Sequence, residues 1–138
     1  MEPEILLFKL KEAFNTHNIE WLVDCFHVEY NSEQPVHPAR SFQGQELVQK
    51  NWTSNFEEMP DFSAQLLRYA INNNAVWAEW EWHGTRKDKT KLHMLGVTIF
   101  GVADGKIKWG RLYMEPVSVS GAGIEAAVKE VMHGKKTQ

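Results

Sequence analysis

One stretch of the chain decides its fold: Val76-Trp77-Ala78-Glu79-Trp80-Glu81-Trp82-His83-Gly84. Side chains of a β-strand point alternately to its two faces, so every second residue shares a face. An extended strand would place Val76, Ala78, Trp80 and Trp82 together, with the glutamates opposite. A helix would scatter these rings and carboxylates around its axis. The stretch therefore predicts a strand with one buried aromatic face and one more polar face.

The composition is that of an ordinary globular domain. The chain has 138 residues, of which 24% are charged and 43% hydrophobic, and its formal net charge is -3. This length suits one domain with a hydrophobic core, and we expect residues 1–138 to form a single domain. Acidic and basic residues are interspersed without a basic stripe, which argues against a nucleic-acid partner.

Cysteine usage and the chain ends indicate the compartment. Cys25 is the only cysteine, which excludes an intrachain disulfide and a multi-cysteine metal site. No apolar run is long enough to span a membrane, and an N-terminus with Glu2 and Glu4 differs from a signal peptide. We therefore expect a cytoplasmic protein with no membrane contact, and a solvated tail at Lys135 and Lys136.

The first half of the chain predicts three helices. Apolar residues recur at helical spacing up to Phe14, and Asn18 suits the N-cap of a second, short helix. A third helix is predicted after Gly44 and ends at Met59, because a residue before proline avoids the helical conformation. Between residues 27 and 44 the periodicity is lost, so we expect an irregular or edge segment there.

The second half predicts a sheet. Asp104-Gly105 is a strong signal for a two-residue hairpin turn, and residues 118–123 form a linker of small residues. A short C-terminal helix follows, which either docks or frays. The expected strands lie at about 61–71, 75–86, 91–103 and 106–117.

Helices followed by an antiparallel meander predict an α+β fold. A long antiparallel sheet twists and curls, and helices laid on its concave side would leave a cone whose mouth suits a ligand. The compact part is expected at about 3–117, with the C-terminal helix and tail at 118–138.

Short motifs occur in the order Asn18-Ile19-Glu20-Trp21, Phe42-Gln43-Gly44, Pro60-Asp61-Phe62, Ala78-Glu79-Trp80, Gly84-Thr85, Gly96-Val97-Thr98-Ile99-Phe100 and Asp104-Gly105-Lys106-Ile107. Together they resemble the nuclear transport factor 2-like superfamily and, within it, the SnoaL-like (polyketide cyclase-like) group. The resemblance covers residues 6–117 and implies the cystatin-like cone fold. Segments 30–40 and 111–117 are similar to a narrower, uncharacterised SnoaL-like subgroup.

This superfamily contains ketosteroid isomerases, polyketide cyclases, dehydratases, epoxide hydrolases and binders without catalysis, so the fold does not select an activity. The resemblance places the carboxylate base of the isomerases near Gln34 and the general acid of the cyclases near Leu112. Neither residue can transfer a proton. Glu33 is adjacent to Gln34, but in an extended segment it would face the other way.

The resemblance also implies which side chains line the cone, and the alternation along the strands agrees. Ser32 and Gln34 are expected to hydrogen-bond either a ligand or the loop backbone. The rings either wall a slot for a planar ligand or only fill a core, although a tryptophan N–H needs a partner when buried. The expected lining comprises Trp52, Val76, Ala78, Trp80, Trp82, Thr98, Phe100, Leu112 and Met114.

Acid–base chemistry has few candidates. His37 could move a proton, Arg40 could hold an anion and Gln34 could orient a substrate; the competing interpretation is a surface loop anchored by prolines. Cys25 lies on an apolar helical stripe and is expected to be a buried, unreactive thiol.

The outer strand face predicts a partner surface. Trp77, Glu79, Trp109, Arg111 and Tyr113 would form an aromatic, charged surface that suits a homodimer interface. His83, His93, Glu79 and Glu81 could be imagined as metal ligands, but no motif of recognised spacing supports this, so no metal is expected.

Three hypotheses follow. The first is a module that binds a small hydrophobic molecule, aromatic or polycyclic, and the missing carboxylates favour it. The second is a lyase or isomerase that uses His37, Arg40 and Gln34 on such a molecule. The third is a dimerisation domain with a filled cone. None of them requires a metal or nucleotide cofactor.

Overall fold

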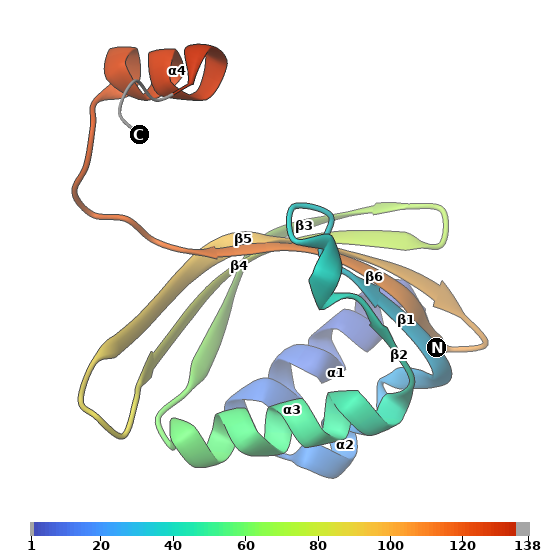
Figure 1. Cartoon of the computed structure of the whole chain (residues 1–138). Helices are drawn as coiled ribbons and strands as arrows, with labels where there is room; N and C mark the ends of the chain where they lie inside the picture. The colour runs from blue at the N-terminus through green and yellow to red at the C-terminus, as the bar shows by residue number, and fades with distance from the viewer. Residues whose placement is uncertain (1, 135–138) are drawn as a thin grey trace.

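The computed structural model describes residues 2–134, and Figure 1 shows a curved sheet arched over three helices. Lys135 and Lys136, expected in a solvated tail, lie outside the described residues. The elements are α1 (Pro3–Thr16), α2 (Ile19–Asp24), β1 (Phe26–Glu33), the 3-10 turn η1 (Pro38–Arg40), β2 (Phe42–Gln43), α3 (Gln45–Glu58), β3 (Ser63–Asn72), β4 (Ala75–Thr85), β5 (Lys91–Ala103), β6 (Lys106–Pro116) and α4 (Ile124–His133).

The sheet has six strands in the order β2-β1-β6-β5-β4-β3. All neighbours pair antiparallel except β1 and β6, which run parallel. The sheet curves but does not close, and α1, α2 and α3 lie on its concave side (Figure 1). The predicted α+β fold with a cone-shaped sheet is confirmed.

The helices begin and end where the sequence predicts. The Asn18 side chain accepts a hydrogen bond from the Trp21 backbone N–H, which caps α2. Helix α3 begins after Gly44, whose φ of 100° is accessible to glycine at little cost, and it ends before Met59. The four long strands also agree with prediction to within a few residues.

The segment predicted as irregular or edge, 27–44, contains two strands, and β2 does lie at an edge of the sheet. Its first part is strand β1, which enters the sheet between β2 and β6. The alternation is interrupted because Val28 and Glu29 are both exposed, and the register with β6 shifts between Phe26 and Asn31. A strand whose pairing is irregular and whose partner lies far along the chain leaves no clean period-two pattern.

The core lies between α1 and the concave face of the sheet. Leu6, Leu7 and Leu10 of α1 are almost fully buried, and so is Trp80 of β4. The α1 residue Phe14 packs edge-on against Trp80, with ring centroids 5.6 Å apart. The aromatic face of β4 is therefore the inner face of the sheet.

Two local features shape the sheet, a hairpin turn at residues 104–105 and a bulge in the edge strand β3. Asp104 and Gly105 both have positive φ, 56° and 71°, as the predicted two-residue hairpin requires. Strand β3 is one edge of the sheet, and the register shift between Leu66 and Arg68 leaves Leu67 outside its pairing with β4.

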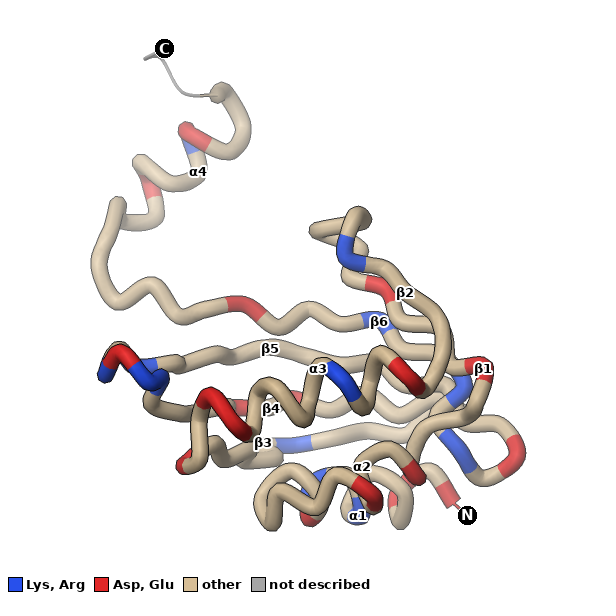
Figure 2. The backbone as a smooth tube through the Cα atoms, turned by 60° about the horizontal axis from the view of Figure 1, so that its bottom comes forward, with Lys and Arg blue, Asp and Glu red and all other residues tan. Residues whose placement is uncertain are grey.

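Helix α4 stands apart from the sheet and the other helices (Figure 1). Its apolar residues Ile124, Val128 and Val131 are exposed. The C-terminal helix thus forms but packs on no other described element. Charged residues of both signs are spread over the helices and turns (Figure 2). Among residues 2–134, no helix is long and apolar enough to cross a membrane.

Candidate functional site: a neutral aromatic cavity

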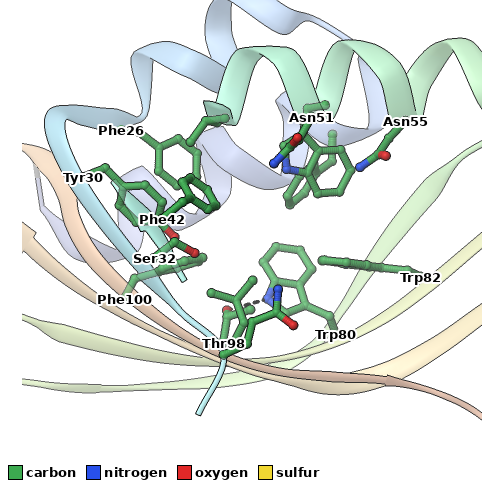
Figure 3. Close-up of a pocket in the computed structure, with 15 residues that line it drawn as sticks. Phe26, Tyr30, Ser32, Phe42, Asn51, Asn55, Trp80, Trp82, Thr98 and Phe100 are labelled. Atoms are coloured by element: carbon green, nitrogen blue, oxygen red, sulfur yellow. Dashed lines mark hydrogen bonds between the residues drawn. The ribbon is translucent and has the colours of Figure 1, made fainter. Parts of the chain in front are cut away.

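A cavity of about 200 Å³ lies between α3, β1 and the inner face of the sheet (Figure 3). Its wall is mainly aromatic and apolar, with a few neutral polar side chains. The lining comprises Phe14, Phe26, Tyr30, Ser32, Gln34, Phe42, Val48, Asn51, Trp52, Asn55, Trp80, Trp82, Thr98, Phe100 and Leu112.

The aromatic wall is held by ring contacts. Trp52 of α3 meets Trp82 of β4 edge-on at 5.6 Å and tilts against Phe14 at 4.7 Å between ring centroids. Phe14 in turn touches Trp80 and Trp82. Each such pair adds about 0.5–1.5 kcal/mol beyond the burial of its surface. The wall is therefore a mutually supported set of rings from three elements.

The two inner tryptophans of β4 differ in their polar contacts. The Trp80 Nε1–H donates to Thr98 Oγ1 at 2.9 Å, and both residues are buried (Figure 3). The Trp82 Nε1–H is also buried, but within residues 2–134 it has no hydrogen-bond partner. A buried donor without an acceptor costs about 1–3 kcal/mol. Because this nitrogen is inaccessible to solvent, a bound molecule could accept a hydrogen bond from it only after a shift of the Trp82 ring.

Strand β1 and the residue that follows it contribute a polar row. Tyr30, Ser32 and Gln34 are spaced by two residues and all line the cavity. Burial raises the pKa of the Tyr30 hydroxyl to about 12, and the nearby Ser32 hydroxyl offsets only part of that rise. Tyr30 thus stays protonated near neutral pH. Gly110 makes room for it, since a Cβ there would lie 2.6 Å from the Tyr30 hydroxyl.

Helix α3 contributes two amides. Asn51 and Asn55 lie on the same helix face as Val48 and Trp52. Figure 3 shows the two asparagine side chains pointing into the space between α3 and Trp80. Within residues 2–134, neither side-chain amide forms a hydrogen bond with another group of the protein. Each can donate and accept.

The chemistry available inside the cavity is uncharged. None of the described lining residues is Asp, Glu, His, Lys or Arg. Phenol, hydroxyl, amide and indole groups can orient a polar atom, but none is a base near neutral pH. The arrangement suits recognition of a neutral molecule.

The structure brings together most of the residues that the sequence placed in the cone. Ser32 and Gln34 line the cavity, while Val76, Ala78 and Met114 are buried in the adjacent core and do not line it. The predicted residues that do line it are Ser32, Gln34, Trp52, Trp80, Trp82, Thr98, Phe100 and Leu112.

Sequence reasoning missed about half of the wall. Asn51 and Asn55 follow Val48 at helical spacings of three and seven, a signal that was present in the sequence. Tyr30 follows from the period-two row once β1 is known to be a strand. The missed residues are Phe14, Phe26, Tyr30, Phe42, Val48, Asn51 and Asn55.

Two of the three catalytic candidates lie outside the cavity. The His37 Nε2 contacts Glu115 Oε2 at 2.9 Å, and Arg40 donates to Gln34 Oε1 at 3.1 Å. Neither His37 nor Arg40 lines the cavity, whereas Gln34 does. Cys25 is buried, and burial raises the pKa of its thiol to about 12, as expected of an unreactive cysteine.

The outer face of the sheet carries the residues expected there. Trp77 and Trp109 are 47% and 37% exposed. Glu33 faces outwards and pairs with Arg111 at 2.9 Å, as the extended-segment argument predicts. Glu79 pairs with Arg68 at 3.0 Å.

Solved structures share this architecture. IdmH from Streptomyces antibioticus, a candidate polyketide cyclase, has a TM-score of 0.72 at 18% identity and covers 83% of this chain and 93% of that chain. A LEH-like epoxide hydrolase from M. tuberculosis has a TM-score of 0.71 at 13% identity, over 82% of each chain. A Catenulispora acidiphila protein with a ketosteroid isomerase-like fold, in complex with trimethylamine, has a TM-score of 0.69 at 14% identity, over 82% and 86%. Identities this low establish a shared fold only.

No curated protein sequence matches this chain. The sequence does match the SnoaL-like domain over residues 9–110, from α1 to the middle of β6. Together with the shared architecture, this shows that the chain belongs to the SnoaL-like domain family.

Proposed function

We propose that the domain binds a small, flat, uncharged molecule that carries a hydrogen-bond acceptor. The observation that carries this proposal is an aromatic cavity whose described lining offers only neutral polar groups, with the buried Trp82 N–H in its wall unpaired among the described residues. Charged ligands would lose hydration there without gaining an ion pair. Apolar pockets with a few placed polar groups are the usual form of small-molecule sites.

The size of the cavity limits the ligand. A volume of about 200 Å³ is below the usual range for ligand clefts, roughly 300–1,000 Å³. An engineered apolar cavity of about 150 Å³ holds benzene. The cavity therefore suits a molecule of one or two rings, which is smaller than the polycyclic ligand considered from the sequence.

Probes of matched shape test the proposal by calorimetry. α-Tetralone and tetralin share a two-ring skeleton, but only the ketone has an acceptor. We expect the ketone to bind up to about tenfold more tightly, since a net hydrogen bond is worth roughly 0.5–1.5 kcal/mol. Trp82→Phe removes one N–H and should reduce the difference, because Asn51 and Asn55 can still donate, whereas Trp77→Phe on the outer face should preserve it in full. Failure of both probes to bind at millimolar concentration would contradict the proposal.

An acid–base enzyme is the second candidate, because the solved neighbours include proteins described as a candidate polyketide cyclase and an epoxide hydrolase. Its support in this chain is the hydrogen bond from Arg40 to Gln34, which connects one expected catalytic residue to the cavity wall. His37 would then serve as the acid–base group. A bell-shaped pH profile of turnover that disappears in His37→Ala would favour this candidate over simple binding.

A further inference from the structure

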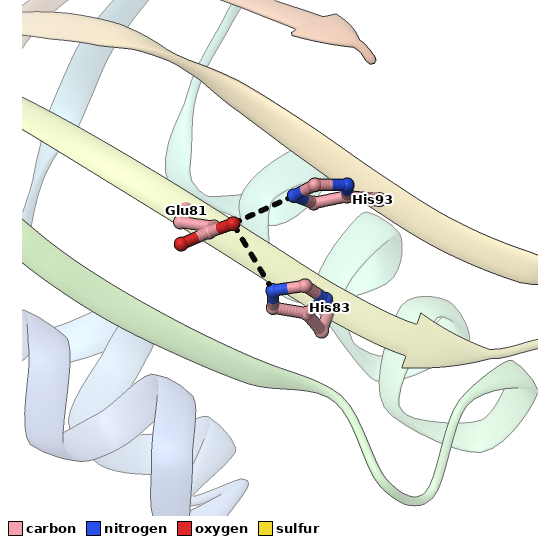
Figure 4. A group of neighbouring side chains, drawn as sticks. All are labelled: Glu81, His83 and His93. Atoms are coloured by element: carbon pink, nitrogen blue, oxygen red, sulfur yellow. Dashed lines mark hydrogen bonds and ion pairs between the residues drawn. The ribbon is translucent and has the colours of Figure 1, made fainter. Parts of the chain in front are cut away.

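Three potential metal ligands meet on the outer face of the sheet, on the opposite side from the cavity. In the register of β4 and β5, His83 lies directly opposite His93. Glu81 precedes His83 by two residues on the same strand face. Figure 4 shows the Glu81 carboxylate reaching towards both imidazole rings. The cluster exists only because the hairpin register brings the histidines together.

The distances within this cluster resemble those around a bound ion. The Nε2 atoms of His93 and His83 lie 2.7 Å and 3.3 Å from Glu81 Oε2. All three ligand atoms lie within 4.8 Å of one another. With metal–ligand bonds of about 2.0–2.2 Å, neighbouring ligand atoms of a tetrahedral zinc site are roughly 3.3 Å apart. Small side-chain rotations would therefore place the three atoms around one ion.

The electrostatic setting suits a cation. Glu81 forms ion pairs with His83 and His93, and no described lysine or arginine pairs with it. The Glu81 carboxylate oxygen that contacts both rings supplies the third ligand atom. The imidazole rings stack with centroids 4.5 Å apart and 13° between their planes. Each stacked ring turns its Nε2 atom towards the same carboxylate oxygen, so the three ligand atoms converge.

Access also fits. The side chains of Glu81, His83 and His93 are 25%, 53% and 36% exposed. An ion can enter from solvent, and the exposed side leaves room for a water molecule as fourth ligand. Two imidazole nitrogens with one carboxylate oxygen are a donor set that Zn²⁺ accepts.

We propose that Glu81, His83 and His93 form a Zn²⁺ site on the outer face of the sheet, with water completing the coordination. This site is separate from the cavity and does not depend on the function proposed for it. The sequence alone argued against a metal, because these residues form no motif of recognised spacing.

Titration of the full-length, tag-free protein with Zn²⁺ tests the site. We expect one equivalent to bind in calorimetry, and Co²⁺ to give the visible absorption of a four-coordinate ion. Of the six histidines, only His83 and His93 should show shifted NMR signals. His83→Gln and His93→Gln should each weaken binding by at least about 100-fold, since even the outer-shell partners of metal ligands are worth roughly 10–100-fold.

The chain offers a matched control. His37 and Glu115 form a histidine–carboxylate pair at 2.9 Å, but without a second histidine. Zn²⁺ affinity should therefore be unchanged in His37→Gln. Glu81→Gln keeps the shape of the side chain but removes its charge, and it should also weaken Zn²⁺ binding. It tests the site independently if a histidine variant fails to fold. Equal Zn²⁺ affinity in wild type, His93→Gln and Glu81→Gln, or no binding to the wild type, would overturn the proposal.

Discussion

The two faces of the same sheet have opposite chemistry. The inner face of β4 presents Trp80 and Trp82 to a cavity whose described lining residues are all uncharged. The outer face of the same strand presents Glu79, Glu81 and His83, which all form ion pairs. Because side chains alternate along a strand, one short sequence specifies both. A register slip of one residue would exchange the faces, so the alternation itself fixes the pairing.

The comparison predicts a large difference in stability between tryptophans on the two faces. Trp80→Ala should lower the free energy of unfolding by about 3–5 kcal/mol, because Trp80 is fully buried and its removal leaves a cavity. Trp77→Ala, at a side chain that is 47% exposed, should cost less than about 1 kcal/mol. Urea denaturation followed by circular dichroism measures both, and similar losses would break the comparison.

The inner face should titrate only at alkaline pH. Burial raises the pKa of Tyr30 from 10.0 to about 12, so the unfolded chain loses this proton at lower pH than the folded chain. The stabilisation is therefore complete below pH 10 and is lost as the pH rises towards 12, by about 3 kcal/mol in total. Tyr30→Phe should remove this part of the alkaline loss in urea denaturation.

Cys25 supplies the control for that measurement. Burial raises the pKa of the Cys25 thiol from 9.0 to about 12. Its ionisation therefore lowers the free energy of unfolding over a pH range that overlaps with that of Tyr30. Cys25→Ala should leave the part due to Tyr30 in place. An identical alkaline profile in wild type and Tyr30→Phe would contradict the assignment.

A smaller effect is expected at the inner hydrogen bond. Thr98→Val removes the acceptor of the Trp80 N–H and should cost about 1–3 kcal/mol, because the buried donor is left unpaired. Thr98→Ser keeps the hydroxyl and should retain most of the stability. Thermal unfolding of the three proteins checks this, and a Thr98→Val variant as stable as wild type would show that Trp80 finds another acceptor.

The smallest change in stability is expected on the outer face, where the homodimer remains a prediction. We expect the wild type to dimerise through the surface containing Trp77, and Trp77→Lys with Leu95→Lys to give monomers. Both side chains are exposed in the single chain, so the monomer should lose less than about 1 kcal/mol. Light scattering coupled to size exclusion measures the mass. A monomeric wild type at high concentration would remove the dimer from consideration.

The sequence predicted those parts of the fold that depend on local patterns. The faces of β4 followed from strict alternation, and the start of α2 followed from the capping chemistry of Asn18. Strand β1 was missed because Val28 and Glu29 interrupt its alternation and its pairing with β6 is non-local.

The site was predictable in part for the same reason. Trp80 and Trp82 belong to a regular strand, so their position in the wall could be inferred. Asn51 and Asn55 share a helix face with Val48 by their spacing, but only the packing of α3 over the sheet shows that this face meets the cavity. The cluster of Glu81, His83 and His93 likewise depends on a hairpin register that the sequence does not state.

The bulge at Leu67 has a consequence for behaviour in concentrated solution. Strand β3 is an edge strand of ten residues, and the Asn15 amide covers only the N–H and C=O of Ala64 on it, so further chains could add to the rest of this edge as extra strands. Leu67, the extra residue of the bulge, interrupts the regular spacing of the backbone N–H and C=O groups along this edge. The neighbouring Arg68 side chain is 79% exposed, so a strand that paired here would also have to accept its charge. Deleting Leu67 would straighten this edge and make the protein a better seed for fibrils.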